Sequence, residues 1–112
     1  MFAFLFGLKS VSPAALQQRA ADYTVIDVNS VQSWNAAHVP QAKRLDALTF
    51  TEHDLPADRA APLVFYCSNP LCRKAPNAAR RARQMGYTEV AVMSAGIKGW
   101  VEAGLPTASA AR

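Results

Sequence analysis

The sequence predicts an α/β fold of three layers, in which helices cover both faces of a parallel sheet. Segments rich in apolar and β-branched residues alternate along the chain with segments whose composition favours helices. The predicted strands are continuous apolar runs, which are typical of strands buried on both faces of a parallel sheet. The chain has 112 residues, of which 51% are hydrophobic and 18% charged. That is enough for one hydrophobic core, so we expect residues 1–112 to form a single domain.

The expected elements, in chain order, are a helix over 12–21, a strand over 23–28, a helix between 30 and 40, an edge strand within 43–46, a strand over 62–67, a helix over 75–85, a strand over 89–93 and a helix over 95–103. In the first half, Ser12 can cap a helix whose first residue is proline. Ser30 can cap the second helix, which ends before Pro40 because proline disfavours a helical residue in front of it. The segment 46–62 holds scattered acids and prolines and is expected to be a loop.

In the second half, the strand over 62–67 is solidly apolar and ends at Cys67. The helix over 75–85 ends at the glycine that follows it. A β-branched run predicts the strand over 89–93. In the last helix Ile97 and Trp100 form a packing pair, and Gly96 is expected only to form a tight turn into that helix.

At the amino end, residues 1–8 are apolar but far fewer than the ~20 that cross a bilayer. They also lack the basic start and the cleavage site of a signal peptide. We expect a short strand or a hydrophobic flap there, and a frayed, flexible tail over 107–112. Two cysteines are too few for a secreted disulfide framework. The prediction is therefore a cytoplasmic protein with reduced thiols and no membrane partner.

Cys67 is the residue best suited to nucleophilic chemistry, because it ends a buried strand and opens a loop before a basic helix. A thiol near a helix start faces unpaired backbone N–H groups and the positive end of the helix dipole, which favour the thiolate and can bind an anion. Five of the twelve basic residues fall between 73 and 83, a placement that favours a small anionic substrate over nucleic acid. The predicted substrate-binding residues are Ser68, Asn69, Leu71, Cys72, Arg73 and Lys74.

Three ordered segments resemble the rhodanese family. The first, residues 25–28 together with 34–42, is similar to the family's strand, aspartate and "His-Ile-Pro-Gly-Ala" signature. The second, residues 64–67 together with Arg73, is similar to the active-site strand and loop. The third, residues 86–106, is similar to the closing segment. The resemblance covers about 12–106 and implies the rhodanese-like form of the three-layer fold.

The resemblance also implies a sulfurtransferase. In that family the loop cysteine attacks a sulfane sulfur donor, becomes a persulfide, and passes the sulfur to cyanide or another thiol, so Cys67 would carry the sulfur. The loop backbone from Ser68 to Arg73 would donate N–H groups to the donor, and the Arg73 guanidinium would bind its oxygens. The implied partners are a thiosulfate-like anion and an acceptor that includes a protein thiol. No metal and no organic cofactor is implied.

The loop departs from the family in its length. A common rhodanese places arginine five positions after the cysteine, whereas Cys72 fills that position here, Arg73 follows, and the loop is about two residues longer. Cys67 and Arg73 therefore fit the Cys-x5-Arg spacing of related phosphatases and arsenate reductases, which is an alternative function. Against it, Tyr66 replaces the usual histidine and Pro70 lacks an N–H. A non-catalytic sulfur-relay or regulatory binding module is a third hypothesis.

Four further residues receive expectations. Cys72 either resolves a persulfide on Cys67 as a disulfide or fills space under the helix. His38 and Asp27 are expected to support the scaffold. Asn29 stands where the family usually has arginine, so a frequent internal ion pair should be missing.

Overall fold

A five-stranded parallel sheet forms the middle layer of this protein. The structure is a computed structural model that describes residues 8–110. The strands are β1 (Leu8–Ser10), β2 (Thr24–Asp27), β3 (Lys43–Arg44), β4 (Leu63–Tyr66) and β5 (Val90–Val92). Their order in the sheet is β1-β5-β4-β2-β3, and every pairing is parallel. The apolar runs therefore form the parallel sheet that the sequence predicts, with the strand that ends before Cys67 at its centre.

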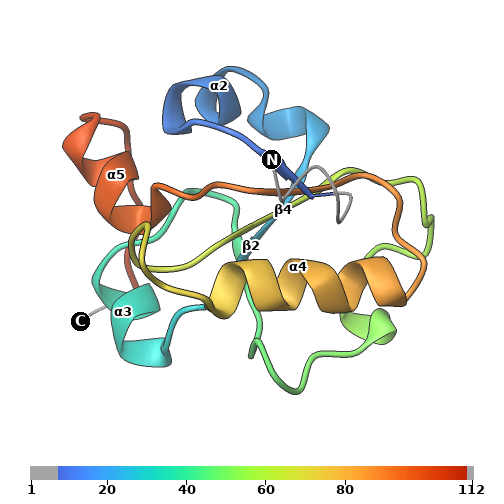
Figure 1. Ribbon diagram of the computed structural model, residues 1–112. Coiled ribbons are helices and arrows are strands. Elements are labelled where there is room, and N and C mark those ends of the chain that lie inside the picture. Colours follow the sequence, from blue (N-terminus) through green and yellow to red (C-terminus); the bar gives the residue numbers. More distant parts are fainter. Residues whose placement is uncertain (1–7, 111–112) are drawn as a thin grey trace.

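Helices cover both faces of this sheet (Figure 1). They are α2 (Pro13–Gln18), α3 (Val31–Ala36), α4 (Lys74–Gln84) and α5 (Gly96–Glu102), with short 3-10 helices at Ala20–Asp22 and Glu52–Asp54. On one face, Leu63 and Phe65 of β4 belong to a core cluster that includes the buried alanines of α4. On the other, Val64 and Tyr66 belong to a cluster with Leu16 of α2 and Trp100 of α5. This alternation confirms the three layers.

The first helix is shorter than predicted. The Ser12 hydroxyl caps it by accepting the Ala15 N–H at 3.1 Å, as expected. The helix ends at Gln18, where the sequence predicted 21, because Arg19 leaves the helical region with φ −125° and its N–H bonds the Leu16 carbonyl at 3.1 Å. A 3-10 turn then leads into β2. The other predicted helices agree with the structure to within a few residues.

The described part of the C-terminal tail, up to residue 110, is hydrogen-bonded to the segment around His38, whereas the sequence predicts a flexible tail over 107–112. His38 and Ala108 form an antiparallel bridge with two N–H···O bonds of 2.9 Å, and the Ala110 N–H bonds the Asn35 carbonyl at 3.1 Å. The His38 ring stacks on Trp34 at 3.4 Å between centroids, and its Nδ1 lies 2.7 Å from the Trp34 carbonyl. His38 thus serves the scaffold.

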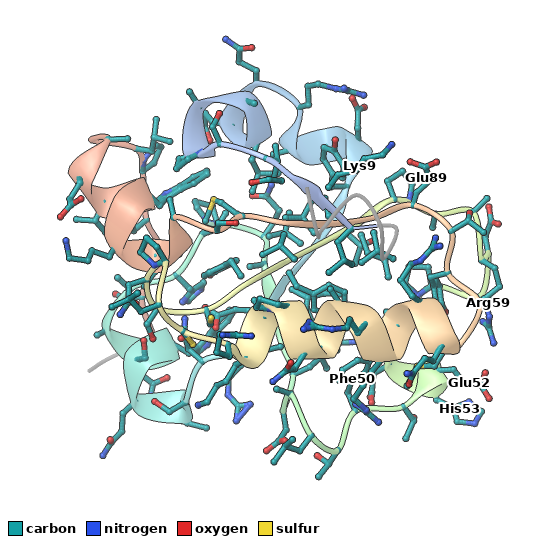
Figure 2. The ribbon with its side chains drawn as sticks, viewed as in Figure 1. Lys9, Phe50, Glu52, His53, Arg59 and Glu89 are labelled. Atoms are coloured by element: carbon teal, nitrogen blue, oxygen red, sulfur yellow. The ribbon has the colours of Figure 1, made fainter. Side chains whose placement is uncertain are left out.

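At the other end of the chain, the expected strand or flap over 1–8 lies outside the described residues except for Leu8, which opens β1. Within 8–110 no helix combines the length and apolar character needed to cross a membrane. Figure 2 shows the ion pairs Lys9–Glu89 and Arg59–Glu52 at the end of the sheet where β5 begins. Cys67 follows the opposite, carboxyl end of β4, so these pairs are remote from it.

Candidate active site

The loop that begins at Cys67 joins the centre of the sheet to α4, at the edge where parallel strands present their carboxyl ends. The start of α5 holds its first two peptides: the Ile97 N–H bonds the Cys67 carbonyl at 2.9 Å, and the Lys98 N–H bonds the Ser68 carbonyl at 3.0 Å. Two segments that are far apart in the sequence therefore fix where the thiol lies.

Gly96 makes that contact possible. Its φ is +69°, and a Cβ placed on it would lie 2.5 Å from the Ser68 carbonyl carbon. Sequence reasoning assigned Gly96 only to a turn and missed its role in positioning the loop. The available signal was a glycine at a strand-to-helix turn beyond the neighbouring strand, but the sequence does not show which backbone approaches it.

The Cys67 side chain is buried, and the residue is only 3% exposed. Burial, followed by the hydrogen bond to Cys72, raises the pKa of Cys67 to about 11, although the N–H groups of Ala75 and Ser68 act to lower it. The sequence argument expected the helix start to favour the thiolate. In the resting structure the loss of solvent outweighs the N–H groups, so Cys67 holds its proton.

Cys72 lies against the same core cluster as Cys67 and is partly buried. The Cys67 thiol points to it, with Sγ 3.5 Å from the Cys72 carbonyl oxygen. Burial raises the pKa of Cys72, but the hydrogen bond from Cys67 and the N–H groups of Ser68 and Lys74 outweigh it and lower that pKa overall. The two thiols share hydrogen bonds and titrate as a pair.

The loop N–H groups converge only in part. The Leu71 N–H bonds the Asn69 side-chain oxygen at 2.8 Å, and the Cys72 N–H bonds the Asn69 carbonyl at 3.1 Å. Both N–H groups therefore point to Asn69 of the same loop and not to the Cys67 sulfur. The N–H groups that reach the sulfurs come from Ser68, Lys74 and Ala75. The predicted cradle from Ser68 to Arg73 is wrong for Leu71 and Cys72, because the Asn69 side chain and carbonyl compete for their N–H groups.

The predicted site residues other than Ser68 separate into three groups. Cys67, Asn69 and Cys72 line a small cavity of about 30 Å³, together with Pro70, Ala75 and residues of the β5 end. Leu71 and Arg73 are exposed, with Leu71 at 88%, and neither is among the residues that line this small cavity. Lys74 lines a larger cavity of about 400 Å³ at the same edge of the sheet.

Ser68 joins the loop to β2. Its hydroxyl donates to the Asn29 side-chain oxygen at 2.8 Å, and the Asn29 N–H donates to the Asp27 carboxylate at 2.7 Å. Asp27 is fully buried; burial raises its pKa, while the Tyr66 hydroxyl and Asn29 act to lower it. Asn29 thus replaces the missing arginine with a neutral connection between the loop and the strand beside it.

The basic helix α4 contributes less to the site than its charge suggests. Arg81 donates to the carbonyls of Ala47 and Phe50 at 3.3 and 2.9 Å, and its guanidinium lies over the Phe50 ring at 4.3 Å. Figure 2 shows Phe50 beside α4. Arg83 donates to the Thr88 carbonyl at 3.0 Å. These side chains hold loops against the helix. No group of three or more His, Cys, Asp or Glu side chains suited to a metal ion occurs within residues 8–110.

Comparisons with known proteins agree with this architecture. A family model described as Rhodanese-like domain matches residues 12–103. An HTH-type transcriptional regulator of Mycobacterium tuberculosis is 33% identical over 92 residues, which make up 80% of this chain and 39% of that relative. The chain therefore spans about two fifths of the regulator's length.

Two solved structures show the same fold at low identity. A thiosulfate sulfurtransferase from Pseudomonas aeruginosa superposes with a TM-score of 0.77 and 21% identity, covering 90% of this chain and 19% of that one. A protein from Rhodopseudomonas palustris described as a possible tyrosine phosphatase superposes with a TM-score of 0.73 and 20% identity, covering 90% and 85%. These two superpositions show that the chain shares its fold with both proteins.

Proposed function

Since the chain belongs to the rhodanese-like domain family, we propose that it is a sulfurtransferase that carries sulfane sulfur as a persulfide on Cys67. Cys67 attacks the outer sulfur of a thiosulfate-like donor, the donor's S–S bond breaks, and sulfite leaves with its electron pair. An acceptor thiol or cyanide then takes the outer sulfur, and the Cys67 thiolate is regenerated. Neither step needs a metal, an oxidant or an organic cofactor.

The observation that carries this proposal is the size of the cavity beside Cys67. At about 30 Å³ it has room for roughly two waters. One added sulfur atom fits such a space, whereas a tetrahedral oxyanion does not. Only the terminal sulfur of the donor has to enter, so its oxygens can remain outside. The N–H groups of Ser68 and Ala75 already lie against the Cys67 sulfur, where they would stabilise the negative charge of a persulfide.

We infer that Cys72 assists the attack of Cys67 as a proton acceptor. The pKa of Cys67 is raised and that of Cys72 is lowered, and the Cys67 thiol is hydrogen-bonded to Cys72. When Cys72 is ionised it can take the Cys67 proton as Cys67 attacks the donor, so the reacting thiolate forms only in contact with substrate. This is a general-base role, in addition to the resolving and space-filling roles that the sequence suggests.

The phosphatase or arsenate reductase alternative has the Cys67-x5-Arg73 spacing in its favour. The loop conformation weighs against it, because the Leu71 and Cys72 N–H groups are directed to Asn69 and Arg73 is exposed. The regulatory alternative has one support, the similarity to part of a transcriptional regulator. A sulfur-relay or regulatory binding module would turn over small acceptors slowly and bind one protein partner tightly.

The test is turnover with thiosulfate and cyanide, followed as thiocyanate, beside hydrolysis of an aryl phosphate. The proposal predicts thiocyanate formation that Cys67→Ala abolishes, and no phosphate release. Phosphate release that both Cys67→Ser and Arg73→Ala abolish, without thiocyanate, would show the phosphatase alternative to be correct. A persulfide that forms but does not pass to cyanide would indicate a relay module.

A further inference from the structure

The cavity of about 400 Å³ at the carboxyl edge of the sheet, here called the edge cavity, has no role in the chemistry described so far. It lies between the end of β2, the start of α3, the loop after β3 and the start of α4, and its lining includes Val28, Asn29, Val31, Arg44, Asp46 and Lys74. Its volume is within the range of about 300–1,000 Å³ usual for pockets that hold small organic ligands.

Two buried hydrogen-bond donors in its lining are unsatisfied. Asn29 is 3% exposed, and its side-chain nitrogen has no partner at hydrogen-bond geometry among residues 8–110; it lies beside the buried Asp27 carboxylate, whose Oδ2 is also unsatisfied there. The Nε of Arg44 is also buried without a hydrogen-bond partner among the described residues. A buried donor without an acceptor is unfavourable, and an oxygen atom of a ligand would satisfy it. Lys74 adds a second positive charge at the start of α4.

The lining contains one carboxylate, that of Asp46. Its Oδ1 accepts the N–H groups of Leu48 and Thr49 at 2.8 and 3.2 Å, so that oxygen is directed to its own loop. The N–H of Leu48 lowers the pKa of Asp46, which is therefore ionised near neutral pH. Two cations against one anion leave the edge cavity positive. Val28, Val31 and two further apolar side chains give it walls suited to a short carbon chain.

The edge cavity is joined to the reacting cysteine by three connections. Ser68, the residue after Cys67, donates its hydroxyl to Asn29 at 2.8 Å. Val28, a lining residue, belongs to the core cluster that contains Cys67. Lys74 directly precedes Ala75, whose N–H reaches the Cys67 sulfur. The two cavities share no lining residue, so a ligand held in the edge cavity lies beside the Cys67 loop, and its thiol has to extend past Ser68 to reach the persulfide.

We propose that the edge cavity binds the carboxylate of a small organic thiol that receives sulfur from Cys67, with Arg44, Asn29 and Lys74 as its ligands. This inference rests on the proposed sulfurtransferase function and names the class of its acceptor. The step is an exchange that balances: the acceptor sulfur bonds to the outer sulfur of the Cys67 persulfide, the Cys67 S–S bond breaks, and the proton of the acceptor thiol passes to Cys67. The products are the Cys67 thiol and a persulfide of the carboxylic acid.

The kinetic test compares 3-mercaptopropionate with its methyl ester, which has the same thiol chain without the charge. Protein already loaded with sulfur is mixed with each acceptor, so differences in loading do not enter. We expect the carboxylate to be the better acceptor by about tenfold or more, as the loss of a charge-assisted hydrogen bond implies. Arg44→Gln should remove most of that preference. The matched control is Lys43→Gln, which changes the same charge on the same strand but whose amine bonds the Asp54 carbonyl.

Equal transfer to the acid and the ester, or an equal preference in the Arg44→Gln and Lys43→Gln proteins, would overturn the proposal. If Arg44→Gln fails to fold, Lys74→Gln takes its place, because Lys74 is exposed at a helix start.

A binding experiment separates this proposal from the sulfur chemistry. The unreactive thioether 3-(methylthio)propionate is titrated into sulfur-free protein, and amide signals are followed by NMR. The proposal expects the signals of Asn29 and Arg44 to shift saturably, and the affinity to fall by about tenfold in Arg44→Gln but not in Lys43→Gln. Such binding in a protein that never forms a persulfide would refute only the proposed function. Persulfide formation without such binding would refute only the acceptor site.

Discussion

Gly96 offers the sharpest test of how α5 positions the active-site loop, through the substitution Gly96→Ala. A Cβ at this position would lie 2.5 Å from the Ser68 carbonyl carbon and 2.6 Å from the Asn69 nitrogen, both backbone atoms that a rotamer change cannot move. The residue also has φ +69°, which side chains rarely adopt. The conformational cost is about 1–2 kcal/mol and the overpacking adds about 1–3 kcal/mol, so unfolding should become easier by about 2–5 kcal/mol.

Gly104 provides the matched control. Its φ is +75°, but a Cβ there would meet nothing within 4 Å. Gly104→Ala therefore carries only the conformational cost of about 1–2 kcal/mol. Urea denaturation gives the free energy of unfolding of both variants. The difference between their losses measures the contribution of the close contact between Gly96 and the loop. Persulfide loading from thiosulfate should be slowed in Gly96→Ala and normal in Gly104→Ala. Equal destabilisation of the two variants, or normal loading in a folded Gly96→Ala protein, would refute the reasoning.

Three further outcomes follow from the site. Cys72→Ala should bring the pKa of Cys67 below about 11, because it removes a hydrogen bond and a like charge that raise it; an unchanged midpoint in a thiolate absorbance titration would contradict this. Burial raises the pKa of Asp27 above 3.8, so the folded state binds the proton more tightly and stability should fall as pH rises from about 4 through the folded pKa. Asp27→Asn should flatten the pH dependence of the urea midpoint, and an unaltered slope would count against it. Ser68→Ala leaves the buried Asn29 oxygen unpaired and should lower the free energy of unfolding by about 1–3 kcal/mol in the same assay. An unchanged free energy of unfolding would contradict this prediction.

The layers of the fold could be predicted because each depends on local patterns. The strand ending before Cys67 is an unbroken apolar run, which is typical of a strand buried on both faces of a parallel sheet. Ser12 and Ser30 mark helix starts through their own side chains, which accept N–H groups three residues later. The hydrogen bonds of the tail could not be predicted, for the opposite reason. Its small polar residues give no signal, and the bonds of Ala108 to His38 depend on a partner 70 positions away in the chain.

The site could be located from the sequence but not described. The position of Cys67 follows from the strand, whereas its raised pKa follows from burial, which depends on residues from several elements. The sequence shows which loop residues carry an N–H group, but the competition from Asn69 for the N–H of Leu71 depends on turn geometry. From the sequence, Asn29 stands out only because the family usually has arginine at this position. Its hydrogen bond with Ser68 and its place in the lining of the edge cavity are visible only in three dimensions.

The most direct measurement of the central claim is the mass of the reduced protein after incubation with thiosulfate, with the added mass located by fragmentation. We predict a gain of one sulfur atom on Cys67, absent in Cys67→Ala and retained in Cys72→Ala. No gain with any sulfane donor, or a sulfur located on Cys72 instead of Cys67, would contradict it.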